Sequence, residues 1–205
     1  MNARIFMDYC HAIDVPSLLS RATLSDDDTG TALRLHLLCE RMVEAWICSC
    51  CDCVELFGSD KNKVRIECDA KIAMAGNLGI PSELVKTLKT FNSLRNDLAH
   101  NPSIEEIPNS RIQSMKDSLN SYLVKFPDEE RLEKTRVGFI GDDEKTISEH
   151  SFNSNETPNR LKLCLIFAKI MKLLFKQVAA NHKGNWDNQF SQFEYNVTVN
   201  ATKPA

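Results

Sequence analysis

Apolar residues recur at helical spacing along most of this chain. From about residue 31 to residue 57 they return every three or four positions, with charged residues on the opposite face. The preceding stretch SDDDTG (25–30) has the acidic residues and threonine of a helix start, and Gly58 suits a helix end. The pattern predicts a long amphipathic helix whose apolar face consists of Leu35, Leu38, Met42, Val43, Trp46, Val54 and Phe57.

Further helices are predicted on both sides of this one. A short apolar segment within 1–24 is broken by Pro16. Pro81 suits the first turn of a helix, and Pro102 ends that helix near His100 because proline disfavours a helical residue before it. The other helices are expected at about 62–79, weakened near Gly76, and at 108–125 and 161–178. Aromatic residues make up only 7% of the chain and β-branched alternation is scarce, which favours an all-α bundle of four to five core helices.

The same pattern suggests one domain with two irregular parts. Residues 1–183 are expected to form a single helical domain, interrupted by a polar excursion at about 127–159. A short hairpin is predicted there around RVGFIG. The tail from 184 to 205 has no helical period, although FEYNVTV suits a short strand.

Net charge and hydropathy limit the partners and the cellular compartment expected for the protein. The net charge is -3, so any binding of nucleic acid needs a local basic patch. The most apolar run, 161–178, carries four lysines, which favours a buried helix over a membrane span. The start of the chain has no secretory pattern. We therefore expect a cytoplasmic protein that does not enter a membrane, with its eight cysteines reduced.

The run CSCCDC (48–53) has the residue types of a metal site. On a helical wheel Cys50 and Cys53 fall on the apolar face, whereas Cys48 and Cys51 fall on the polar face. Thiols that point two ways on one helix do not complete a tetrahedral site, and a second pair would have to come from Cys10, His11, Cys68 or another subunit. We therefore predict buried reduced thiols, with no bound metal and no cofactor.

The stretch SLRNDLAH (93–100) ends the helix that begins near Pro81. Leu84, Leu88, Phe91 and Leu98 form a stripe in which Arg95 takes a core-facing position. A guanidinium there needs a partner or a polar groove. Asn96 and His100 share another face, turned by roughly 100–140° from Arg95 on an ideal helix.

Arg95 also has a purely structural interpretation. It could complete a buried ion pair with Glu40 or Glu44, while Asn96 and His100 cap the helix end. Under this hypothesis the protein is a helical domain without a site on this helix.

The wider run AKIAMAGNLGIPSELVKTLKTFNSLRNDLAHNP resembles the HEPN superfamily, in which a helix ends in an arginine, a polar residue, three variable residues and a histidine. Here these are Arg95, Asn96 and His100. Within that superfamily the chain is most similar to the mannitol operon repressor-like branch. The resemblance also includes Lys71-Ile72 and the helix ALRLHLLCERMVEAWI, and it covers about 31–125.

The resemblance implies a HEPN-type bundle and a metal-independent endoribonuclease that acts as a homodimer. A histidine can accept the proton of the 2′-hydroxyl, and an arginine can hold the charged phosphate. Asn96 would orient His100 or hold a phosphate oxygen. If two such helices face each other across a dimer axis, each Arg95 can meet the His100 of the partner chain.

An alternative remains open. Proteins that resemble this branch include regulators, so the chain could be a non-catalytic regulatory or protein-interaction module with a protein partner, such as an antitoxin. No basic recognition helix is evident for direct operator binding. A lysine stripe on the last helix is usually a solvated face, but it could also follow an RNA backbone; it consists of Lys162, Lys169, Lys172 and Lys176.

Overall fold

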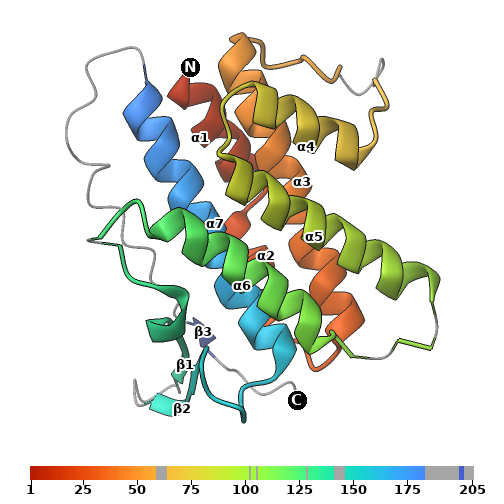
Figure 1. The fold of residues 1–205 in the computed structure, drawn as a ribbon. Coiled ribbons are helices and arrows are strands. Elements are labelled where there is room, and N and C mark those ends of the chain that lie inside the picture. The colour runs from red at the N-terminus through yellow and green to blue at the C-terminus, as the bar shows by residue number, and fades with distance from the viewer. Residues whose placement is uncertain are drawn as a thin grey trace.

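The chain folds as an all-α helical bundle with a small sheet at one end (Figure 1). This computed structural model describes residues 1–58, 64–101, 103–104, 106–127, 129–140, 146–182 and 199–200. Within them the helices are α1 (Ala3–Ala12), α2 (Val15–Thr23), α3 (Asp28–Cys51), α4 (Cys68–Asn77), α5 (Ser82–His100), α6 (Asn109–Leu123) and α7 (Asn159–Asn181). The remaining elements are the 3-10 turn η1 (Leu132–Lys134) and the strands β1 (Arg136–Ile140), β2 (Thr146–Ser151) and β3 (Val199–Asn200).

Helix α3 is the central element of the bundle. It contacts α1, α2, α4, α5 and α7, so its core positions extend well beyond one narrow stripe. Trp46 is 1% exposed, and its Nε1 donates to the carbonyl oxygen of Leu78 at 3.3 Å, which fixes the turn after α4 against α3. Burial of large apolar side chains on several sides of one helix is the main stabilising contribution expected for such a bundle.

Helix α3 starts close to the predicted position but ends earlier than predicted. The Asp27 carboxylate accepts from the backbone N–H groups of Thr29 and Gly30 and caps the helix. Asp52 adopts the left-handed region (φ 53°) and terminates it. The prediction of a helix to residue 57 was wrong because the apolar spacing continues past this turn; Val54 lies outside the helix and is 57% exposed.

The α4–α5 corner brings two helices close together. Gly79 has φ 103°, a conformation that glycine adopts without strain. In α4 a Cβ on Gly76 would lie 3.0 Å from Val85 of α5, so the missing side chain allows this approach. Gly76 was expected to weaken this helix, but α4 continues through it, and the glycine allows α5 to pack closely. Helix α5 ends at His100, as Pro102 predicts.

The hairpin predicted around RVGFIG is confirmed. Strands β1 and β2 pair antiparallel, with Arg136 opposite Ser151, and β3 pairs parallel to β1. Of the strand suggested by FEYNVTV, only Val199 lies within the described residues. No helix of the described part is both long and apolar enough to cross a membrane.

Candidate functional site

The core stripe of α5 differs from the predicted one at its centre. Leu94 fills the gap between Phe91 and Leu98 and is 1% exposed. Arg95 is displaced by one position from the stripe and is half-buried. The expectation of a guanidinium centred on the core was wrong, because the stripe follows a spacing of three residues from Phe91 to Leu94.

The polar residues of the motif lie on the outer side of the last two turns of α5. Nη1 of Arg95 donates to Oδ1 of Asn96 at 2.9 Å, so these two side chains are brought together. Asn96 and His100 are exposed, and His100 is the last residue of the helix. No side-chain hydrogen bond or ion pair joins His100 to another described residue of the same chain.

Asp97, between the two halves of the motif, faces the neighbouring helix. Nη2 of Arg111 in α6 lies 2.5 Å from Oδ2 of Asp97. Both side chains are more than a third exposed, so this ion pair contributes modestly to stability. It nevertheless holds α6 against the end of α5 that carries the motif.

A hydrogen-bonded chain of three residues lies one turn before Arg95. Nε2 of His36 in α3 lies 2.9 Å from Oδ1 of Asn92 in α5. Nδ2 of Asn92 donates to Oδ1 of Asp69 in α4 at 3.0 Å. Because an amide oxygen only accepts, Nε2 of His36 carries the proton. These two hydrogen bonds therefore link α3, α4 and α5 one turn before the motif.

The surroundings of His36 favour its neutral form, because they lower its pKa. Its side chain is 5% exposed, and burial lowers its pKa. The bond to Asn92 and the charge of Glu40 oppose this effect. The cations Arg95 and Lys71 add to the lowering of the His36 pKa, which also places Arg95 within electrostatic reach of this buried imidazole.

The carboxylates offered as structural partners of Arg95 are bound by another cation. Nζ of Lys71 lies 2.7 Å from Oε1 of Glu40 and 2.7 Å from Oε1 of Glu44. Burial opposes the charge of Lys71, but these two hydrogen bonds outweigh it and raise its pKa. Glu44 also pairs with Arg41 at 2.9 Å. Arg95 is therefore not needed to neutralise either carboxylate.

This polar layer was not recognised in the sequence. His36, Glu40 and Glu44 recur every fourth residue along α3, so they form one line on the helix. That line lies beside the apolar face and is covered by α4 and α5. The regular spacing was a usable signal, although nothing in the sequence identifies Asp69 and Asn92 as its partners.

Three of the four lysines predicted to form a stripe on α7 take part in ion pairs. Lys169, Lys172 and Lys176 all form ion pairs with Glu129, at 3.6 Å for Lys169 and 3.7 Å for Lys172. Lys169 is 5% exposed, and burial lowers its pKa to about 8. Only Lys162 forms no ion pair with a described residue. The four lysines therefore do not form one open cationic stripe.

The cysteine cluster is divided by the end of α3. Cys48 is fully buried and its Sγ lies 3.4 Å from the hydroxyl of Tyr9, so its assignment to the polar face was wrong. Cys51 and Cys53 are exposed, so the prediction of buried thiols was wrong for these two. Cys53 is not on the apolar face because the helix ends at Cys51. Burial raises the pKa of Cys48 and of Cys50, which favours protonated thiols. The described residues contain no group of three or more side chains suited to a metal ion.

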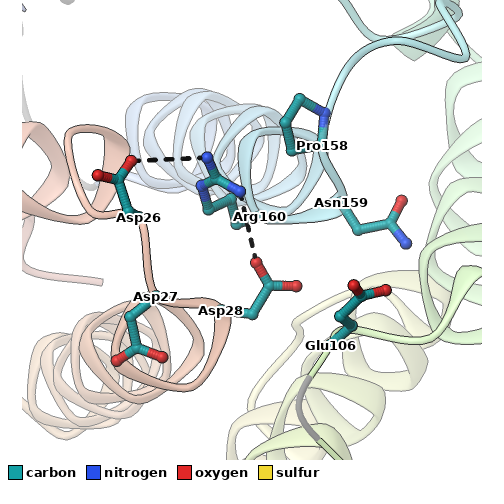
Figure 2. A pocket seen from close by; sticks show the side chains of 7 residues that line it. All are labelled: Asp26, Asp27, Asp28, Glu106, Pro158, Asn159 and Arg160. Atoms are coloured by element: carbon teal, nitrogen blue, oxygen red, sulfur yellow. Dashed lines mark ion pairs between the residues drawn. The ribbon is translucent and has the colours of Figure 1, made fainter.

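A polar hollow of about 420 Å³ lies where the α2–α3 and α5–α6 connections meet the start of α7 (Figure 2). Figure 2 shows Arg160 between Asp26 and Asp28, with nitrogen–oxygen distances of 3.7 Å and 3.8 Å. Nε of Arg160 also donates to the carbonyl oxygen of Ser25 at 3.0 Å. The Arg160 guanidinium therefore joins the start of α7 to the α2–α3 connection.

No known protein-family model matches this chain, and no curated protein or solved structure is detectably similar to it.

Proposed function

We propose that the chain is a HEPN-like, metal-independent endoribonuclease that acts through Arg95, Asn96 and His100. The observation that carries this proposal is the exposed arrangement of the motif at the end of α5. Nη1 of Arg95 donates to Oδ1 of Asn96 at 2.9 Å, and the exposed His100 lies on the same face as the exposed Asn96, one turn later. The carboxylates that would give Arg95 a purely structural role are bound by Lys71.

The chemistry assigns one role to each residue. His100 accepts the proton of the ribose 2′-hydroxyl, whose oxygen attacks the adjacent phosphorus and expels the 5′-oxygen of the next nucleotide. The leaving 5′-oxygen takes a proton from water and becomes a hydroxyl. The guanidinium of Arg95 binds the phosphate oxygens and stabilises their developing charge. Asn96 orients the guanidinium through its side-chain oxygen. The products are a 2′,3′-cyclic phosphate and a 5′-hydroxyl end.

The site is proposed to form between two copies of the chain. On an ideal helix Arg95 and His100 diverge by roughly 140° at ~100° per residue, so one α5 does not aim both side chains at a single phosphate. A second α5 across a two-fold axis supplies the missing group, since such an interface repeats each contact. A cytoplasmic protein partner that covers this surface would act as an inhibitor.

The test is an RNA-cleavage assay in EDTA with total tRNA and a long mRNA. Wild type should produce 2′,3′-cyclic ends, and His100→Ala and Arg95→Lys should each lower the rate by about 100-fold or more. Arg95→Lys keeps the positive charge but not the bidentate geometry, so it separates phosphate binding from general electrostatics.

The matched control is Lys89→Ala, which removes an exposed cation from the same helix and should leave the rate unchanged. Circular dichroism checks that each variant is folded. Absence of cleavage by folded wild type, purified without a bound partner, would contradict the enzyme and support a regulatory module in its place.

A further inference from the structure

A second polar hollow lies between the start of α6, the start of α7 and the segment after β2. Its volume is about 400 Å³, within the range of small-molecule sites. A smaller hollow adjoins it and shares Asn109, Asn155 and Lys162 with it. We call the pair the Lys162 hollow. Both helices begin at the same end of the bundle (Figure 1), where Nδ2 of Asn159 donates to the carbonyl oxygen of Ile107 at 2.7 Å.

The charges that line the Lys162 hollow are all positive. Two lysines line it and no carboxylate does. Lys116 is neutralised by Glu133 at 3.2 Å, whereas Lys162 forms no ion pair with a described residue. Lys162 is half-buried, and a cation that is partly removed from water gains from an anion bound beside it. This is the opposite of the acidic hollow of Figure 2, where Arg160 is paired with carboxylates.

The remaining lining groups supply hydrogen-bond donors. Asn109, Asn153 and Asn155 each carry an amide NH₂ group, and Ser110 carries a hydroxyl. The amide of Gln113 is partly engaged, since it donates to Asp117 at 2.7 Å. A cation beside several neutral donors suits an oxygen-rich anion, because each oxygen can accept from a separate group.

We propose that the Lys162 hollow binds a phosphate monoester, with the Lys162 ammonium as its counter-charge and the amides of Asn109 and Asn155 as donors. A monoester carries close to two negative charges and three terminal oxygens, more than a phosphodiester offers to such a group of donors. The phosphate can belong to a small molecule or to the 5′ end of an RNA. This site is separate from the α5 motif and does not depend on RNA cleavage.

The first experiment titrates inorganic phosphate into the full chain by calorimetry at constant ionic strength. Wild type should bind it saturably, and Lys162→Gln should weaken binding by about tenfold, the loss expected for one charge-assisted contact. Asn155→Ala should weaken it less. Lys172→Gln is the matched control, because Lys172 lies on the same helix but pairs with Glu129. Non-saturable binding, or equal losses in Lys162→Gln and Lys172→Gln, would overturn the proposal.

The second experiment identifies the source of the phosphate. Two 2′-O-methyl oligonucleotides, which cannot be cleaved through a 2′-hydroxyl, differ only in a 5′-phosphate or a 5′-hydroxyl. Tighter binding of the phosphorylated form that disappears in Lys162→Gln supports an RNA end. Binding of inorganic phosphate without any 5′-phosphate preference supports a small phosphate monoester. Equal binding of both oligonucleotides that depends on Lys162 would indicate backbone contacts and overturn the proposal.

Discussion

A polar layer joins α3, α4 and α5 one turn before Arg95. Lys71 neutralises Glu40 and Glu44, and Asn92 connects His36 to Asp69. These contacts restrain the three helices, because a shift of one helix would leave the buried charges of Lys71 and Glu44 unpaired. Arg95 therefore extends from a well-fixed stretch of α5, which suits the phosphate-binding role proposed for it.

His36 should make the stability of the protein sensitive to mild acid. Its pKa is lowered in the folded state, so the unfolded chain binds the proton more readily. The stabilisation is complete above the unfolded pKa of about 6.5 and is lost as the pH falls below it. We expect the urea midpoint to decrease between about pH 7.5 and pH 5.5, and to decrease less in His36→Gln.

The control for this measurement is His11→Gln, an exposed histidine on α1 that should leave the pH dependence unchanged. Glutamine at position 36 can still donate to Asn92 but does not titrate in this range. A pH dependence that is the same in His36→Gln and in wild type would show that other groups account for it.

At the residue scale the sequence identified the motif but not its surroundings. The spacing of Arg95, Asn96 and His100 was visible, and their positions at the end of a helix were predicted correctly. The prediction placed Arg95 in the core because it assumed a step of four residues after Phe91. In the structure the step is three residues, so Leu94 occupies the core position. Helical spacing allows both steps, and only packing selects between them.

At the level of elements, the local chemistry of helix ends matters as much as periodicity. Asp27 caps α3, the helix that contacts five others, and its two oxygens accept from two different N–H groups. Asp28 in the next position accepts from the N–H of Ile107 at 2.8 Å, which joins the α5–α6 connection to the same helix start. This end of α3 therefore organises both its own first turn and a distant loop.

Replacement of Asp27 by alanine should lower the free energy of unfolding by about 1 kcal/mol, the usual cost of a lost N-cap. Urea unfolding with unchanged slope would show that stability has changed without a change in the folded state. Asp26→Ala is the matched control. Asp26 is fully exposed and contributes one long contact to Arg160, so its removal should change little. Equal losses in the two variants would contradict a capping role for Asp27.

The predicted bounds of α5, α6 and α7 agree with the structure within three residues. The helix expected at 62–79 begins only at Cys68, and α3 ends at Cys51 instead of near residue 57. Asp52 stops α3 although Val54 and Phe57 continue its spacing. Cys48 was assigned to a polar face because a wheel assumes one buried side, whereas α3 is covered on several sides. These outcomes depend on neighbouring helices and on one left-handed residue, and a single-helix pattern contains neither.

At the level of the whole molecule, the outer face of α5 has two properties that suit a partner. The central helix and its polar layer lie beneath α4 and α5, so this side of the bundle is well supported. Its last turns expose Asn96 and His100, and α6 is fastened beside them through the Arg111–Asp97 pair. A supported surface with exposed polar side chains can meet a second copy of itself without rearranging the core.

The shared site predicts complementation between two inactive variants, and this prediction rests on the proposed cleavage activity. In a mixed dimer of Arg95→Ala and His100→Ala, one site loses both groups and the other retains an intact Arg95 and an intact His100. Random mixing makes about half of the dimers mixed, and each has one of two sites intact, so about a quarter of the wild-type activity should return. If each chain builds its own site, no activity returns.

The measurement is made after the two variants are denatured and refolded together, with sedimentation velocity to establish that dimers form. Each variant refolded alone is the control for residual activity. Recovery that rises with the mixed-dimer fraction requires Arg95 of one chain and His100 of its partner to act on the same phosphate. Dimers that form without recovery would contradict the shared site while leaving the interface intact, and activity in monomer fractions would place both groups within one chain.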